Sequence, residues 1–195
     1  MSSLVLSGDT SGTVTLSVPA VSGSNTLTIQ AGTGTNSMNT LATAVASTSG
    51  TNIDFTGIPA WVKKITVMLA GVSVSGTSII QVQLGDSGGI ENTGYLAQAW
   101  AATSTGVATS GVYLSIANAA ANVWIAQLVI SNYSGNSWLV SGISNITQAS
   151  NVGYQIVGSK TLSDVLTQLC VTTVNGIDTF DVTPSAGSIN ILYEG

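Results

Sequence analysis

The stretch Ile80-Gln81-Val82-Gln83-Leu84 decides the fold, because apolar and amide side chains alternate in it at every residue. Successive side chains of a β-strand point to opposite faces of a sheet, so this alternation predicts a strand with one apolar face. The same period of two recurs in residues 65–69 and 112–116. Helix-forming residues such as Glu, Lys and Arg are scarce, while Val, Ile and Thr are frequent. We therefore predict an all-β protein.

Further strands are predicted towards the C-terminus. Residues 123–130 (VWIAQLVI) are apolar at nearly every position, which is typical of a central strand covered on both faces. Residues 162–174 are ambiguous, because their leucines also have helical spacing. The β-branched residues before the Asn175-Gly176 turn favour a strand from Val165 onward. About eight such strands predict that residues 51–195 form one antiparallel β-sandwich domain, jelly-roll-like in architecture.

The N-terminal part of the chain has a different character. Residues 1–35 are predicted to be an attachment or oligomerisation segment, in which the alternating residues 13–18 and 25–30 form a short hairpin. An isolated hairpin is marginally stable in water, so we expect it to pair with a partner chain or to dock elsewhere. Residues 36–50 are small and polar, which predicts a linker, and residues 38–46 are compatible with a short helical turn.

The charge composition excludes several classes of function. The chain has 3 Lys or Arg, 8 Asp or Glu and no His, which gives a formal net charge of −5. We therefore expect no zinc site built on His or paired Cys, no imidazole base and no cofactor. Three cations do not neutralise the phosphates of a duplex, so no nucleic-acid partner is expected. The low charge density also removes a usual defence against self-association, which predicts a homo-oligomer.

Membrane insertion is not expected either. A membrane-spanning helix needs about 20 predominantly apolar residues. The best candidate, residues 115–130, is interrupted by Asn118, Asn122 and Gln127. The N-terminus lacks both a basic region and a long apolar region, so it has no recognisable secretory signal.

The segment Gly85-Asp86-Ser87-Gly88-Gly89 spells the local motif around the nucleophile of chymotrypsin-like serine proteases. That chemistry needs a base hydrogen-bonded to the serine, and the chain contains no His. A Ser–Lys arrangement would need one of the three lysines, Lys63, Lys64 or Lys160, and no pattern in the sequence positions one beside Ser87. We interpret the segment as a Gly-rich turn whose Asp86 or Ser87 side chain bonds the backbone, and we predict no catalytic residue and no enzymatic activity.

Three other side chains were weighed as sites. Asp178 and Asp181 lie close together after a turn, and loop carboxylates bind calcium. Two carboxylates without a recognised ladder of ligands favour solvated turn residues, so no metal site is predicted. Cys170 lies in an apolar strand, which favours a small buried residue over a reactive thiol.

Aromatic side chains at strand ends or near turns are the remaining candidates for a functional site. An aromatic ring on a loop offers a large rigid surface for stacking on a sugar or contacting a protein, although packing in the core or in a subunit interface explains the same residues. The candidate receptor or interface aromatics are Trp61, Tyr95, Trp100, Tyr133 and Trp138.

Three stretches together resemble known proteins. Residues 11–35 (SGTVTLSVPAVSGSNTLTIQAGTGT) are similar to the short N-terminal segment of many bacteriophage tail-fibre and related virion proteins. Residues 54–96 (DFTGIPAWVKKITVMLAGVSVSGTSIIQVQLGDSGGIENTGYL) and 171–195 (VTTVNGIDTFDVTPSAGSINILYEG) resemble the start and the end of a β-rich domain of phage and prophage tail proteins. Residues 182–185 depart from that pattern as an insertion before the last strand.

The resemblance implies a structural component of a virion that is trimeric and takes part in host attachment. The chain has no long shaft, heptad repeat or collagen-like repeat, so it is not by itself a long fibre. We therefore expect a non-enzymatic short tail-fibre or tip component that forms a homotrimer with other virion proteins as partners and a host-surface glycan or protein as receptor. The alternatives are a capsid decoration (cement) protein, a soluble carbohydrate-binding β-sandwich module and a hydrolase centred on Ser87. The first two expectations place the chain on the phage tail or the capsid surface.

Overall fold

The computed structural model describes residues 3–7, 13–17, 39–102, 104–147 and 151–195. The chain divides into two compact units, Met1–Asn36 and Ser37–Gly195, which are described separately. All regular structure in the described ranges is β-strand, and no helix in them is long and apolar enough to cross a bilayer.

The first unit contains a two-stranded antiparallel sheet. Strand β1 (Ser3–Ser7) pairs with β2 (Thr13–Ser17), with Val5 opposite Thr15. The predicted strand at residues 13–18 is thus confirmed, but its partner in this sheet is the preceding segment. The predicted second strand, residues 25–30, lies outside the described residues.

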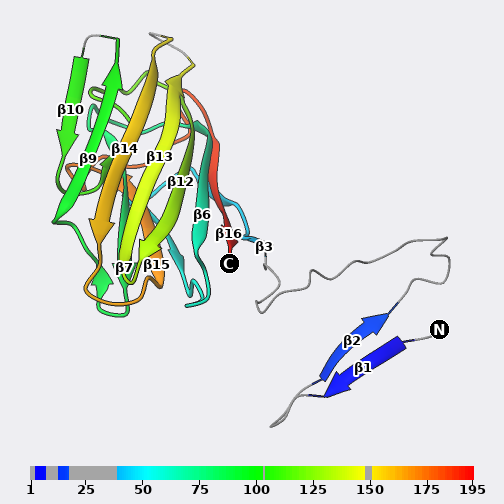
Figure 1. The fold of residues 1–195 in the computed structure, drawn as a ribbon. Coiled ribbons are helices and arrows are strands. Elements are labelled where there is room, and N and C mark those ends of the chain that lie inside the picture. The colour runs from blue at the N-terminus through cyan, green and yellow to red at the C-terminus, as the bar shows by residue number, and fades with distance from the viewer. Residues whose placement is uncertain (1–2, 8–12, 18–38, 103, 148–150) are drawn as a thin grey trace. The chain divides into compact units, whose positions relative to one another are not determined.

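The second unit is an antiparallel β-sandwich, as predicted. Its nine-stranded sheet, called the large sheet, faces the viewer in Figure 1, and β7 and β15 of the second sheet lie behind it. In spatial order the large sheet consists of β10 (Ser104–Ala108), β9 (Tyr95–Ala101), β14 (Gly153–Thr161), β13 (Ser137–Ile146), β12 (Trp124–Ser134), β6 (Lys64–Val72), β16 (Gly187–Glu194) and β3 (Asn39–Leu41), with β4 (Val45–Ser47) also paired to β16. The jelly-roll-like detail stays a prediction.

The second sheet, called the small sheet, has five strands. In spatial order it consists of β11 (Val112–Tyr113), β7 (Ile80–Asp86), β15 (Gln168–Thr173) and β5 (Asn52–Thr56), with β8 (Gly89–Ile90) paired to β7. The alternating stretch of residues 80–84 therefore lies in β7, inside this sheet, and its apolar residues belong to the hydrophobic core between the sheets.

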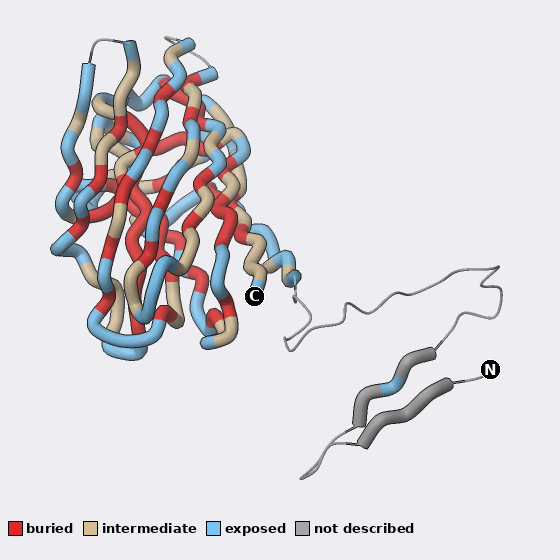
Figure 2. Tube along the Cα trace, in the orientation of Figure 1, coloured by how far each residue is buried: buried red, intermediate tan, exposed pale blue. Residues whose placement is uncertain are grey.

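The core lies between the two sheets. Trp124, Leu128 and Ile65 of the large sheet are fully buried and belong to one hydrophobic cluster with Val82 and Leu169 of the small sheet. Along β14 buried and exposed residues alternate strictly from residue 153 to 158. Figure 2 shows this alternation along the strands of the large sheet. Each strand of this sheet thus contributes one face to the core and leaves the other outside.

Three predictions of local structure need correction. Strands β3 and β4 lie inside the predicted linker, residues 36–50, and both pair with β16, so residues 39–41 and 45–47 belong to the large sheet. The described part of the predicted helical turn, residues 39–46, is not helical. The strand predicted from Val165 begins at Gln168. The helical spacing of the leucines before it arises because Leu162 and Leu166 are buried in an irregular segment.

The third correction concerns β12. Its apolar sequence predicts a strand covered on both faces, but only one face is covered within the described residues. Trp124, Leu128 and Ile130 are buried, whereas Ile125 and Gln127 on the opposite face are exposed. The strand is central in its sheet, with β13 on one side and β6 on the other. Its second apolar face therefore points away from the sandwich core.

Candidate functional site on the outer face of the large sheet

The candidate site is the side of the large sheet that points away from the small sheet, over β10, β9, β14, β13 and β12. We call it the outer face. Six of its aliphatic side chains are substantially exposed, and Leu96 and Ile143 reach 77% and 63% exposure. The six are Leu96, Val107, Ile125, Leu139, Ile143 and Val157. Scattered single exposed aliphatic residues are ordinary on protein surfaces, but a contiguous group of them marks an interaction site.

The strand register arranges the outer face as an alternation of apolar and neutral polar side chains. Directly opposite residues on neighbouring strands lie side by side, about 5 Å apart. One row across the strands runs Trp100, Gln155, Ile143, Gln127 and Met68. The next row runs Val107, Gln98, Val157, Ser141 and Val129. In both rows every apolar residue is flanked by an amide or a hydroxyl.

The described strands of the outer face present no side chain that is charged at neutral pH. The five strands that form it contain a single charged residue, Lys160, and it is buried on the inner side of β14 opposite Trp138. The nearest outward ions are Lys64 of β6 and Glu194 of β16, which pair with each other at 2.6 Å between Nζ and Oε2. The chain's net charge of −5 is therefore located elsewhere.

The amides of the outer face are not used within the sandwich. Within the described ranges no side-chain hydrogen bond joins Gln98, Gln127 or Gln155 to another residue. A side-chain amide offers two N–H donors and a carbonyl acceptor. The face therefore presents neutral hydrogen-bonding groups and aliphatic surface together, both available to a partner.

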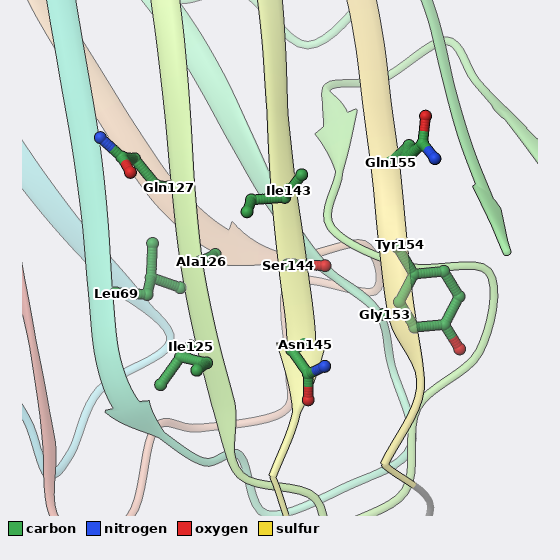
Figure 3. A pocket seen from close by; sticks show the side chains of 10 residues that line it. All are labelled: Leu69, Ile125, Ala126, Gln127, Ile143, Ser144, Asn145, Gly153, Tyr154 and Gln155. Atoms are coloured by element: carbon green, nitrogen blue, oxygen red, sulfur yellow. The ribbon is translucent and has the colours of Figure 1, made fainter.

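A hollow lies in one part of this face. It has a volume of about 550 Å³ and is lined by three consecutive residues from each of β12, β13 and β14, together with Leu69. Figure 3 shows Ile143 of β13 in the middle, with Ile125 and Gln127 of β12 on one side and Gln155 of β14 on the other. Gly153, which has no side chain, helps to leave this space open.

A separate polar cluster joins the end of β7 to the segment after β14. The Ser163 hydroxyl lies 2.6 Å from Asp86 Oδ2 and 2.8 Å from Glu91 Oε1, and the Ser163 backbone N–H also donates to Glu91. Lys160 forms an ion pair with Glu91 and lies 5.4 Å from the Tyr95 ring centre. Lys160 of β14 thus holds Glu91 by charge, and the Ser163 hydroxyl joins Glu91 to Asp86.

These contacts shift the acidity of both carboxylates in the same direction. The hydrogen bond from the Ser163 side chain and then that from the Gly88 backbone lower the pKa of Asp86. Burial acts to raise the pKa of Glu91, but the hydrogen bonds from Lys160 and Ser163 outweigh it, so the pKa of Glu91 also lies below its ordinary value. Both groups are held in their charged forms, which suits an ion-paired link between strands.

The protease-like segment forms the turn that the sequence analysis favoured. Strand β7 ends at Asp86, β8 begins at Gly89, and Ser87 and Gly88 form the turn between them. The Gly88 backbone N–H donates to Asp86 Oδ1 at 2.7 Å, so Asp86 is the side chain that bonds the turn backbone. Lys160 and Lys64 are each engaged with a glutamate.

The two aspartates proposed as calcium candidates serve different loops. Asp178 accepts hydrogen bonds from the Asn175 side chain and the Ser78 backbone, which lower its pKa in that order. Asp181 accepts from the Ser73 hydroxyl at 2.6 Å. Each carboxylate closes its own loop, and no group of three or more acidic, Cys or His side chains with metal-binding geometry lies in the described ranges.

The five candidate aromatics do not form one site. Tyr95 and Trp138 are buried, and the Tyr95 hydroxyl lies 2.6 Å from the Leu84 backbone nitrogen, which donates to it. Trp61 is half-buried and packs against Tyr193 with ring centres 5.9 Å apart. Tyr133 is exposed at the end of β12, and only Trp100 lies on the outer face.

Cys170 is buried, and burial raises the pKa of its thiol. It lies on the outward side of the small sheet, in register with Asp54 and Gln83, rather than in the main hydrophobic cluster. Its burial confirms a structural thiol, although its position differs from that of a core residue.

The outer face is a feature that the sequence patterns did not reveal as a site. In residues 123–130, 139–143 and 155–157 aliphatic residues occupy both alternating sets of positions, and no charged residue intervenes. This pattern predicts coverage on both faces for residues 123–130, and only a strand for the other two stretches. Comparison of the chain with protein-family models, curated proteins and solved structures finds no match.

Proposed function

We propose that the chain is a non-enzymatic structural subunit of a bacteriophage virion, a short tail-fibre or tip component that assembles as a homotrimer and contacts the host surface. The observation that carries this proposal is the outer face, where exposed aliphatic side chains alternate with amides that have no partner in the described sandwich. Such a surface is typical of the core of a protein–protein interface, which is poor in charged residues. A subunit built into an assembly requires a surface of this kind.

Two further observations support the proposal. The first unit contains only a two-stranded sheet in its described residues, and a sheet of that size is marginally stable alone, so attachment to another chain would stabilise it. The stretches that resemble phage tail proteins include β5 to β7 and the last strand, β16, which belong to both sheets of the sandwich.

The proposal is tested on phage particles. An antibody raised against the recombinant chain should label purified virions at the tail end in electron micrographs. A phage whose chain lacks residues 1–35 should produce particles without the antigen, while the shortened protein keeps its β-sheet circular dichroism. Intact virions that lack the antigen would contradict the proposal, and loss of folding on deletion would contradict the division into two parts.

The hollow supports a second candidate function, binding of a neutral glycan. Gln127, Asn145 and Gln155 line it beside Ile125 and Ile143. Amides hydrogen-bond sugar hydroxyls, and aliphatic side chains cover the apolar face of a sugar ring. Binding on a glycan array that disappears in Gln155→Ala and persists in the off-face variant Asn92→Ala would support this function, and absence of any glycan binding would contradict it.

A further inference from the structure

We propose that the outer face is the contact between copies of this chain, so that a second copy covers the exposed side chains of β9, β12, β13 and β14. This inference deepens the proposed function, because it names a second copy of the chain as the partner of the outer face. It rests on that proposal for the number of copies. Three features of the face point to a second copy as its occupant.

The first feature is charge. Two copies of a chain with a net charge of −5 repel each other wherever their acidic groups meet. The outer face brings no such groups together, because the only charged residue of its strands, Lys160, is buried on the inner side. The Lys64–Glu194 pair beside the face is neutral as a unit. A nucleic acid or an anionic membrane would find no cation on this face, whereas a second copy finds no repulsion.

The second feature is chemical self-complementarity. Each glutamine of the face carries both donors and an acceptor, so an amide of one copy is able to pair with an amide or hydroxyl of the other. The aliphatic residues between them, such as Ile143 and Val157, supply the apolar area whose burial favours association. Burying the Gln155 amide against aliphatic groups alone would cost free energy, because its hydrogen bonds to water would be lost. The alternation along the rows places neutral polar side chains near every amide of the face, so such burial is avoided.

The third feature is size. The five strands are between 5 and 11 residues long and contain 42 residues in all. At roughly 3.3 Å per residue and about 4.8 Å between strands, they give a face of roughly 670 Å². A stable protein–protein interface buries about 800 Å² on each partner. Individual stable interfaces span roughly 600 to 1,000 Å² per partner, and the area of the outer face falls within this range, so the face is large enough for one contact between two copies.

The experiment uses the full chain and its mass in solution, measured by light scattering and sedimentation at micromolar concentration. The wild type should be an oligomer. Ile143→Lys and Val157→Lys place a cation on the face at positions already exposed in the single chain, and each should weaken association by about 100-fold or more. The matched control is Ile177→Lys, since Ile177 is also exposed, at 74%, but lies in the turn after β15; it should leave the mass unchanged.

Each possible result of these measurements supports or contradicts the inference. A monomeric wild type, or an oligomer that both face variants leave intact, would overturn the inference; urea unfolding of each variant shows that a mass change does not come from misfolding. A dimer that the face variants dissociate would support the inference and contradict the proposed trimer. An oligomer that depends on this face, in a protein absent from virions, would support the inference and contradict the proposed function.

Discussion

The outward glutamines of the two sheets differ in burial and in hydrogen bonding. On the small sheet Gln83 and Gln81 are buried: Gln83 Nε2 donates to the Ser110 carbonyl at 2.7 Å, and Ser110 Oγ donates to Gln81 Oε1 at 3.0 Å. On the large sheet the corresponding glutamines, such as Gln127 and Gln155, are exposed and have no side-chain partner in the described ranges. Within the second unit the chain covers the outward side of β7 with its own residues, whereas the outward amides of β12 and β14 are exposed.

This difference has a physical reason. A buried amide must be hydrogen-bonded, because an unpaired one costs about 1 to 3 kcal/mol. The segment around Ser110 supplies those bonds over β7, so the outward amides of this strand are hydrogen-bonded within one chain. No described segment of the second unit crosses the middle strands of the large sheet on its outer side, and the side chains there are neutral and of mixed polarity. This composition supports the proposal that a second copy covers the outer face.

The largest expected effect is a loss of stability that distinguishes a lysine on the inner side of the large sheet from a lysine on its outer side. Lys160 on the inner side is only 5% exposed and is paired with Glu91, whereas Lys64 on the outer side is 45% exposed and is paired with Glu194. Removing one partner of a buried pair costs about 3 to 5 kcal/mol, and an exposed pair contributes at most about 1 kcal/mol. Lys160→Met should therefore lower the free energy of unfolding in urea far more than Lys64→Met. Equal losses would contradict the assignment of Lys160 to the interior.

The next prediction compares the two outer faces directly. Gln83→Ala removes the donor to the Ser110 carbonyl and should cost about 1 to 3 kcal/mol of stability. Gln127→Ala removes an exposed amide and should change the stability of the single chain by no more than about 0.5 kcal/mol. Urea unfolding at low protein concentration, where association does not contribute, measures both. A comparable loss in the two variants would remove the distinction between the faces.

The fold was largely predictable from the sequence, and the coverage of its faces was not. In β7 the alternation fixed both the strand and its inward side, because period two is the geometry of a strand. Its outward Gln81 and Gln83 are nevertheless buried, and no local sequence pattern predicts that residues 110–113 pack beside them. In β12 the two apolar faces predict a strand covered on both sides, but they do not indicate whether the cover comes from the same chain or from a partner. An apolar face destined for a partner has the same sequence as one covered by the chain itself.

Acid should weaken the polar cluster that links the sheets. Hydrogen bonds and the Lys160 ammonium hold the pKa of Glu91 below its ordinary value of 4.5, and Ser163 and Gly88 do the same for Asp86. A group whose pKa is lowered on folding stabilises the fold above its unfolded pKa, and this stability is lost as the pH falls through the folded pKa. The free energy of unfolding should therefore decrease from about pH 5 downward. In Ser163→Ala the decrease should be shallower, and an unchanged slope would contradict the role of Ser163.

The smallest expected effect is the maleimide labelling of Cys170, whose thiol lies on the outward side of the small sheet. Cys170 is buried and its pKa is raised by burial, so little thiolate forms at neutral pH. A maleimide should leave the native protein unlabelled and should label it fully in urea, as measured by mass spectrometry. Rapid labelling of the native protein would show that the small sheet is more open than its hydrogen bonds indicate.

This inert native thiol permits the most direct test of the central claim that copies of the chain cover the outer face. Cysteine introduced at Ile143 and, separately, at Ile177 places a thiol at two positions that are 63% and 74% exposed in the single chain. In the native protein at micromolar concentration, maleimide should react with Ile143→Cys at least about tenfold more slowly than with Ile177→Cys, because association protects the face. Equal labelling rates at the two positions would show that the outer face is open to solvent and would contradict the account.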